Sequence, residues 1–258
     1  TPSAPPSSRA VVCSTKASSI SVSPTSPSGS RNSPVGPTAP TLAAGLPEPV
    51  RTTPLGGIRK TIADHMRGSI AATAQLSFFL EMDVTDVQRL RREASSGVST
   101  TVALAHVLIK ACAETLKRHP EHNTVLSNGN ILHFDEINIG FAVALSEGLI
   151  VPVLKQVDGK SIPEIAGEMD ELAGKARDGK LLSDDVSGGT FTISVLGSVD
   201  GFTPILNAGQ DAIVGVGRSV EKPVVRKGEV VVREMLTVSL TVDHQVIDGA
   251  AAASFLRR

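Results

Sequence analysis

A polar cluster that could do chemistry interrupts the last twenty residues of the chain, SLTVDHQVIDGAAAASFLRR, and consists of Asp243, His244, Gln245 and Asp248. Apolar and polar residues alternate up to Asp243, which predicts a strand that ends at His244. The residues beyond predict a helix with Asp248 as its N-cap. His244 is therefore expected at a strand tip, where its imidazole can project into a crevice. An imidazole is a suitable base for a thiol, whose pKa is about 8.5, and the resulting thiolate is a nucleophile.

The same residues also have a plain structural interpretation. Asp248 could serve only as a helix cap, and His244 could fill a corner of the core. The short pattern His-x-x-x-Asp-Gly does not decide between the two roles, because so short a pattern also arises by chance.

Helices and strands are mixed along the part of the chain that leads to this cluster. The pattern predicts a helix from about Ile58, a strand over Leu76–Val84 and a helix capped by Asp83 or Thr85. It then predicts a helix that is capped by Ser99 or Thr100 and stopped by Pro120. Strands on both sides of a turn at Ser146–Gly148 and an amphipathic helix through Ile162 and Ala176 follow. In the stretch GGTFTISVLG, alternation places Thr190, Thr192 and Ser194 on one face of a strand. Two further strand patterns and the final helix complete an α/β sandwich-like domain of about two hundred residues.

Composition narrows the class of protein. The 258 residues carry a net charge of −1 with dispersed basic residues, which argues against a nucleic-acid footprint or a polybasic membrane patch. The longest apolar stretch, Ile137–Leu154, is broken by polar residues and is not expected to span a membrane. The two cysteines, Cys13 and Cys112, lie far apart and favour a reducing compartment. No charged and then apolar leader opens the chain, and since the first residue is Thr1 we expect a fragment.

Residues 1–50 differ from the rest because they hold ten of the sixteen prolines, together with many serines, threonines and alanines. Such a segment buries too little apolar surface to offset its chain entropy. We expect a flexible linker there, either a plain end or a tether that swings a neighbouring module, and a globular domain over residues 51–258.

Several stretches together resemble one family. DHQVIDGA is similar to the Asp-His-Arg-x-x-Asp-Gly signature of the dihydrolipoamide acyltransferases, the core subunits of 2-oxoacid dehydrogenase complexes. PLGGIRKTIADHM, HPEHNTVLSNGNILHFDEINIGFAVALSEGLIVPVLK, LLSDDVSGGTFTISVLGS and FTPILNAGQDAIVGVG resemble the catalytic domain of that family in the same order, from about Pro54 to Arg258. The resemblance implies a chloramphenicol-acetyltransferase-like sandwich with a mixed sheet and helices. It also implies a homotrimer with active sites between subunits, from which larger cores are built.

The resemblance assigns roles to particular residues. His244 would take the proton from the attacking thiol of coenzyme A or dihydrolipoamide, and Ser194 would donate a hydrogen bond to the tetrahedral oxyanion. Asp248 would anchor the loop that carries the histidine, with Arg59 or Arg67 as a buried partner. Asn123 would help to shape the substrate site, although a turn residue after Pro120 is an equally good interpretation.

Three departures from the family pattern affect the site. Gln245 replaces the arginine of the signature, Val195 replaces an asparagine, and NAGQ at Asn207–Gln210 replaces the common NPPQ. We assign no metal, because His65 and His133 lack partners at metal-ligand spacing. His106 is expected to be packed in a helix, and His119 and His122 are expected as cations at a helix C-terminus.

The expected activity is transfer of an acyl group, acetyl in a pyruvate dehydrogenase complex, between coenzyme A and a lipoyl group carried on a domain outside this stretch. The implied partners are the 2-oxoacid dehydrogenase and dihydrolipoamide dehydrogenase subunits, without nucleic acid or membrane. The bacterial cytoplasm is the expected compartment, with the mitochondrial matrix and plastid stroma as alternatives. Two other functions stay open: a non-catalytic core subunit, and an O-acetyltransferase of the chloramphenicol type.

Overall fold

The computed structural model describes residues 47–95, 102–146 and 148–258. The chain divides into two compact units, Thr1–Thr52 and Thr53–Arg258, and the second carries the helices and strands of the described residues. The predicted linker lies outside the described residues up to residue 46. That prediction and the boundary of the predicted catalytic domain therefore stay predictions.

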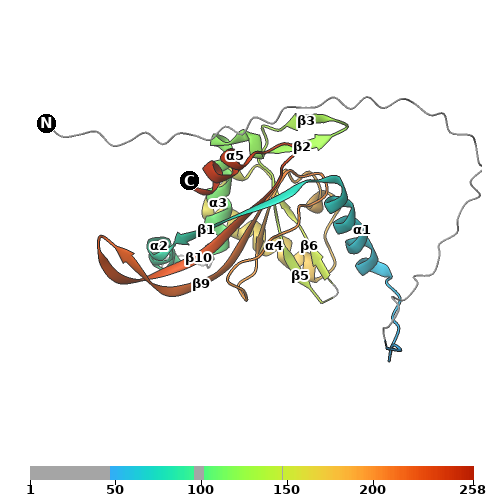
Figure 1. Cartoon of the computed structure of the whole chain (residues 1–258), viewed down its shortest axis with the longest axis horizontal. Coiled ribbons are helices and arrows are strands. Elements are labelled where there is room, and N and C mark those ends of the chain that lie inside the picture. Colours follow the sequence, from blue (N-terminus) through green and yellow to red (C-terminus); the bar gives the residue numbers. More distant parts are fainter. Residues whose placement is uncertain (1–46, 96–101, 147) are drawn as a thin grey trace, which may run out of the picture. The chain divides into compact units, whose positions relative to one another are not determined.

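A mixed six-stranded sheet forms the centre of the unit Thr53–Arg258 (Figure 1). Its strands run in the order β1-β10-β9-β8-β4-β7, with bounds Gln75–Asp83, Glu229–Asp243, Ala212–Arg226, Phe191–Val195, Ile139–Phe141 and Val153–Leu154. β8 pairs in parallel with β4 and with β9, and the other neighbours pair antiparallel. The mixed sheet confirms the predicted α/β class.

β9 and β10 form one long hairpin of two 15-residue strands. The turn between them holds Lys227 and Gly228 at φ values of 52° and 86°, as a two-residue hairpin turn that follows the strand twist requires. Segment 200–204 then crosses β9 so closely that a Cβ added at Gly217 would lie 2.0 Å from the carbonyl oxygen of Asp200. This approach explains why a glycine occupies that position.

Five helices accompany the sheet among the described residues. They are α1 (Gly57–Ala72), α2 (Thr85–Ser95), α3 (Leu104–Arg118), α4 (Ile162–Arg177) and α5 (Gly249–Leu256). Short 3-10 turns, η1 to η3, span Pro120–His122, Val157–Gly159 and Asp184–Val186, and two small hairpins are β2–β3 (Thr124–Ser127 and Asn130–His133) and β5–β6 (Val143–Leu145 and Gly148–Ile150). No helix of the described residues has the length and apolar character needed to cross a bilayer.

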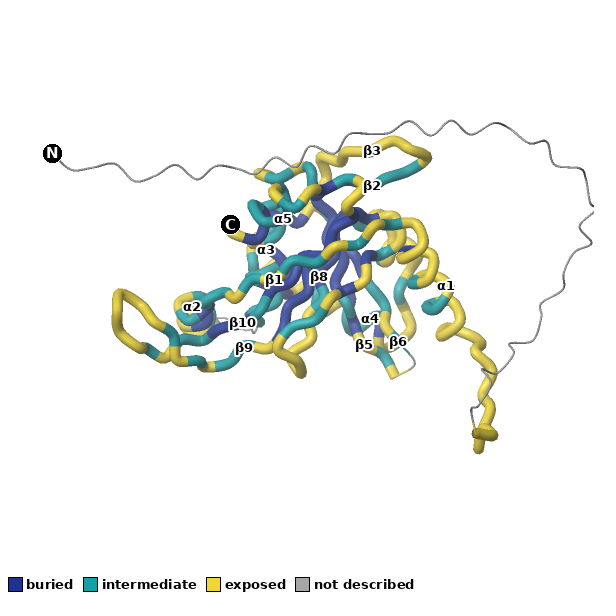
Figure 2. The backbone as a smooth tube through the Cα atoms, viewed as in Figure 1, coloured by how far each residue is buried: buried dark blue, intermediate teal, exposed yellow. Residues whose placement is uncertain are grey.

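The hydrophobic core lies between the sheet and helices α3, α4 and α5, where Figure 2 shows the densest burial. Strand register places Ile193, Val214 and Leu240 side by side on the face that contributes to this core. Ile109, Ile165 and Phe255 contribute to it from the three helices. Residues one position along each strand, Ser194 among them, therefore point to the opposite face of the sheet.

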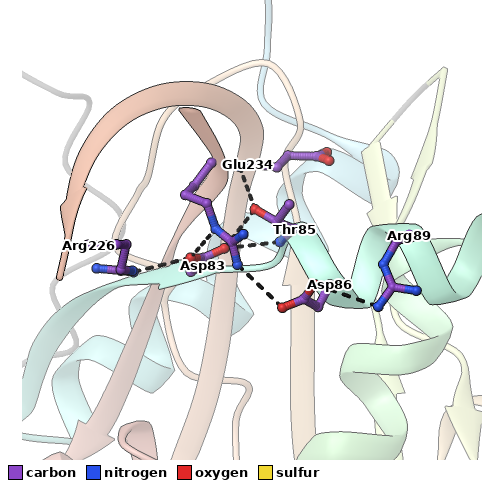
Figure 3. Close-up of polar contacts among 7 residues, drawn as sticks. Asp83, Thr85, Asp86, Arg89, Arg226 and Glu234 are labelled. Carbon is purple, nitrogen blue, oxygen red and sulfur yellow. Dashed lines mark hydrogen bonds and ion pairs between the residues drawn. The ribbon is translucent and has the colours of Figure 1, made fainter. Parts of the chain in front are cut away.

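A polar corner fixes the far end of the β9–β10 hairpin to β1 and α2 (Figure 3). The Asp83 carboxylate accepts hydrogen bonds from the Thr85 hydroxyl (2.7 Å), from Nε of Arg233 (2.8 Å) and from Arg226 (3.2 Å). Burial alone would raise the pKa of Asp83, but the hydrogen bonds from Arg233, Thr85 and Arg226 together hold it below its usual value. Asp83 also accepts from the backbone N–H of Thr85, so one of the two predicted caps does serve the start of α2.

The other predicted elements are found close to their expected limits. The structure confirms the helix from about Ile58, the strand before α2, the strands around residue 147 and the amphipathic helix α4. The helix expected after Ser99 or Thr100 begins at Leu104, with Ala103 as its N-cap. The two predicted cap residues lie outside the described residues.

Candidate functional site

His244 directly follows β10, as predicted, and lies on an exposed turn; that its imidazole projects into a crevice stays a prediction. Its backbone N–H donates to the carbonyl oxygen of Ala74 at 2.8 Å, and the N–H groups of Val246 and Ile247 both donate to the carbonyl oxygen of Asp243. The turn is therefore tight, and its backbone is fixed to the segment between α1 and β1. His244 is therefore exposed to solvent on a turn whose backbone is fixed by hydrogen bonds.

A buried carboxylate organises this turn. Asp243 is fully buried, and its Oδ1 accepts from the N–H groups of Ala74 and Gln245 at 3.0 Å each. The Gln245 side chain donates to Asp243 Oδ2 and to the carbonyl oxygen of Ala72, both at 3.0 Å. Gln245 thus ties the turn to the end of α1, and its place in the signature motif is a loop-anchoring one. The sequence analysis counted Asp243 in the polar cluster but gave it no role, although it directly precedes the histidine.

Asp248 caps α5, as predicted. Its Oδ1 accepts from the N–H of Ala251 at 2.9 Å, and the residue is exposed. Within the described residues of a single chain neither Arg59 nor Arg67 pairs with Asp248, so the expected arginine partner stays a prediction. Both arginines are exposed residues of α1, and the carboxylate is instead satisfied by the helix N-terminus.

Ser194 lies near the end of β8 and is half-buried on the sheet face opposite the core. β8 lies between β4 and β9, so Ser194 is on an interior strand of the sheet and not on an edge. Two residues earlier, the buried Thr192 hydroxyl donates to Gln210 Oε1 at 2.7 Å and accepts from Asn207 Nδ2 at 2.9 Å. Residues of the divergent NAGQ segment therefore complete this polar face beside Ser194.

The structure does not bring His244 and Ser194 of one chain together. Ser194 pairs in register with Gly215, which pairs with Ser239 on β10, so the serine is two strands away from β10. His244 lies five residues beyond Ser239. At about 3.3 Å per residue along a strand and about 4.8 Å between neighbouring strands, the Cα atoms of Ser194 and His244 are about 19 Å apart. The predicted base and the predicted donor of one chain are therefore too far apart to act on the same carbonyl group.

Asn123 is buried, and its amide nitrogen donates to the carbonyl oxygens of Phe134 (2.7 Å) and Glu136 (3.0 Å). These bonds fix the loop between β3 and β4. The predicted contribution of Asn123 to a substrate site is not tested by these contacts and stays a prediction.

The remaining histidines differ in their surroundings. His106 is packed as predicted: it is buried, burial lowers its pKa, and its Nδ1 accepts from the N–H of Ala103 at 3.1 Å. The expectation of a cation is wrong for His122, because this side chain is fully buried and burial lowers its pKa to about 4. The structure also brings His119, Glu121 and His122 together, a cluster that the sequence reasoning did not identify.

A second buried carboxylate lies behind the histidine turn. Asp211 accepts from the Thr124 hydroxyl (2.8 Å) and the N–H of Leu126 (3.1 Å), and its carbonyl oxygen accepts from the N–H of Asp243. Burial raises the pKa of Asp211 in spite of these hydrogen bonds, and the charge of Asp243 acts in the same direction. Two acidic residues thus support the end of β10 from inside the fold.

Fold and site define a class of α/β domain that presents a histidine from a rigid turn at the end of a central strand. The family described as 2-oxoacid dehydrogenases acyltransferase (catalytic domain) matches residues 47–258. The acetyltransferase component of the acetoin cleaving system of Bacillus subtilis (strain 168) is 38% identical over 210 residues, which are 79% of this chain and 53% of that protein. The chain belongs to this acyltransferase family, and it spans about half the length of the curated relatives it matches.

Two solved structures are similar over most of the chain. One is a structure of Azotobacter vinelandii dihydrolipoamide acetyltransferase, from a study of the roles of a serine, a histidine and an asparagine in its catalytic mechanism. It has a TM-score of 0.80 and 36% identity, and the match covers 86% of this chain and 94% of that one. The other is the cubic core of the pyruvate dehydrogenase multienzyme complex, with a TM-score of 0.79 and 35% identity over 86% and 94% of the two chains.

Proposed function

We propose that this chain transfers an acetyl group between a dihydrolipoamide arm and coenzyme A, as the core subunit of a pyruvate dehydrogenase complex. The observation that carries the proposal is the exposed His244 on its anchored turn, four residues before the cap of α5. The family and the acetyltransferase relatives support it.

The proposed chemistry begins with the thiol of coenzyme A or of dihydrolipoamide, depending on the direction. The His244 imidazole removes the proton of this thiol, and the resulting thiolate attacks the carbonyl carbon of the acetyl thioester on the other carrier. The tetrahedral intermediate carries its negative charge on the former carbonyl oxygen, where a hydroxyl donor lowers its energy. Collapse breaks the original carbon–sulfur bond, and the leaving thiolate takes the proton back from the imidazolium. No atom is lost, and the acetyl group changes carriers.

Ser194 is the proposed donor to that oxyanion. In the Azotobacter vinelandii protein the histidine and the asparagine are four positions apart, as His244 and Asp248 are, and the serine precedes the histidine by about fifty positions in both chains. This spacing supports the assignment of His244, Ser194 and Asp248 as the corresponding residues.

The separation of His244 from Ser194 supports an active site shared between copies of the chain. If the histidine of one copy faces the serine of the next, both can reach one thioester, and closed symmetry generates equivalent sites. We infer a homotrimer with one such site at each interface, and further assembly into a larger core as in the cubic core that this chain resembles.

The lipoyl group would arrive on a domain outside this stretch. Coenzyme A is then a substrate, and the 2-oxoacid dehydrogenase and dihydrolipoamide dehydrogenase subunits are the proposed partners. We infer that the pocket for lipoamide and coenzyme A forms where two copies meet.

Acyl transfer by the purified chain tests the proposal against its two alternatives. The chain is given acetyl-coenzyme A with dihydrolipoamide or with chloramphenicol, and the acetylated product is measured. We expect transfer to dihydrolipoamide that is lost in His244→Ala. Transfer to chloramphenicol would indicate an O-acetyltransferase, and a folded but inert assembly would indicate a non-catalytic core subunit.

A further inference from the structure

Unpaired polar atoms gather at one corner of the core. Within the described residues, the buried side-chain nitrogen and oxygen atoms without a hydrogen-bond partner are His122 Nδ1, His122 Nε2 and Asn123 Oδ1. Buried polar groups are nearly always paired, so an imidazole with both nitrogens unpaired needs a specific explanation. His122 is fully buried, which excludes exposed solvent as the partner.

Two further ligand-type atoms lie beside this imidazole. Nδ1 of His119 is 3.1 Å from Oε1 of Glu121, and Nδ1 of His122 is 3.6 Å from the same oxygen. The three ligand atoms all lie within 4.8 Å of one another. They come from one short segment, because His119 is the C-cap of α3 and the other two belong to the 3-10 turn Pro120–His122.

We propose that His119, Glu121 and His122 form a binding site for a zinc ion. Two imidazole nitrogens and one carboxylate oxygen are donors that zinc takes in proteins, and bonds of about 2.0–2.2 Å in a tetrahedral arrangement place ligand atoms about 3.4 Å apart. The separations of 3.1 and 3.6 Å fall on either side of that value. The fourth position is open to water or to a further ligand.

The surroundings of the three side chains favour a cation. The site lies at the C-terminal end of α3, where the helix dipole is negative. Glu121 is the most exposed of the three ligands, with 44% of its side chain accessible, whereas His119 is 12% accessible.

Packing alone does not account for His122. Its ring lies against Phe255 of α5, with centroids 4.7 Å apart and planes tilted by 32°. A phenylalanine could make the same contact without two unpaired nitrogens. An ion bound at Nδ1 would explain why a histidine occupies this buried position. Through the contact with Phe255 it would also stabilise α5, the helix that Asp248 caps.

Zinc titration of the full chain tests the site independently of any acyltransferase activity. The protein is stripped with a chelator, and zinc chloride is titrated in by calorimetry, with thermal unfolding in parallel. We expect one zinc ion per chain with a dissociation constant in the micromolar range or lower. At free zinc about 100 times that constant, the unfolding temperature should rise by about 5–10 °C.

Single substitutions assign the binding to these residues. His122→Phe keeps the contact with Phe255, and we expect it to fold and to lower zinc affinity by at least about tenfold. His119→Ala and Glu121→Gln should weaken binding as well and serve if His122→Phe fails to fold. His65→Ala removes an exposed histidine of α1 and is the matched control, which should bind as the unsubstituted chain does.

The proposal is overturned if the chain binds no zinc in the micromolar range. It is equally overturned if the three variants bind zinc as tightly as the His65→Ala control. In the second case the bound ion would belong elsewhere on the chain, and His122 would be a packed side chain only.

Discussion

Ser194→Ala should remove only the hydrogen bond that we propose to the oxyanion. Among the hydrogen bonds of the described residues, none involves the Ser194 hydroxyl, and the residue is only half-buried. Its loss therefore leaves no polar partner unpaired within the chain. The unfolding temperature should stay within about 2 °C of the unsubstituted protein, because substitutions at the protein surface usually change the free energy of unfolding by less than about 0.5 kcal/mol.

The effect on catalysis should be far larger. Loss of one donor to a developing oxyanion costs about 10²–10³ in kcat, or about 2.7–4 kcal/mol of transition-state stabilisation. KM for acetyl-coenzyme A and for dihydrolipoamide should change little, since the charge exists only in the transition state. Steady-state kinetics over both substrates, with thermal unfolding measured on the same sample, provides the comparison.

Ser239→Ala is the matched control for this substitution. Ser239 lies in the same row of the sheet, but its hydroxyl donates to the carbonyl oxygen of Phe202 at 2.7 Å. The control should lose about 1 kcal/mol of stability with the hydrogen bond and keep its kcat. A tenfold or larger rise in KM for Ser194→Ala with kcat unchanged would refute the oxyanion role and make Ser194 a substrate-binding residue.

Three further substitutions test the supports of the site and of the fold. Gln245→Ala removes the side-chain hydrogen bonds to Ala72 and Asp243 and should lower kcat about tenfold, whereas Gln245→Arg should restore it; equal activity of both variants would show that the anchor is dispensable. Asp248→Ala should lower the unfolding temperature by about 2–4 °C through loss of the α5 cap, and Asp248→Asn should not; the capping role fails if calorimetry finds the two variants alike. The pKa of Asp83 is held below its value in the unfolded chain, so the stabilisation by Asp83 is present above about pH 4 and is lost as the pH falls further. The free energy of unfolding of Asp83→Asn, measured with denaturant, should therefore vary less with pH below about 4 than that of the unsubstituted chain; equal pH dependence would contradict this role.

The local elements could be predicted because their signals are local. α4 begins where Ser161 and Glu164 form a capping box, with both side chains bonded to the other residue's backbone N–H. Asp248 was recognised as a cap from the same kind of evidence. The alternation along β8 separated Ser194 from the core residue Ile193 before any tertiary information was available.

Tertiary relations could not be predicted in this way. Asp243 looks like the polar end of a strand, and only the fold shows that the N–H of Ala74, 169 positions earlier, makes it an anchor. His122 follows a proline at a helix end, where exposure is the ordinary expectation, and only its contact with Phe255 shows it to be buried. The distance between Ser194 and His244 depends on strand order, which periodicity does not reveal.

The most direct test of the central claim mixes two inactive chains. His244→Ala and Ser194→Ala are co-expressed with different affinity tags, and assemblies that carry both tags are isolated and assayed for acetyl transfer to dihydrolipoamide. If each site takes the histidine from one chain and the serine from the next, about one quarter of the sites are intact in a large, randomly mixed core, and about one third in a trimer that carries both tags. About that fraction of the activity should return. Mixed assemblies no more active than the better single variant would contradict a site shared between chains.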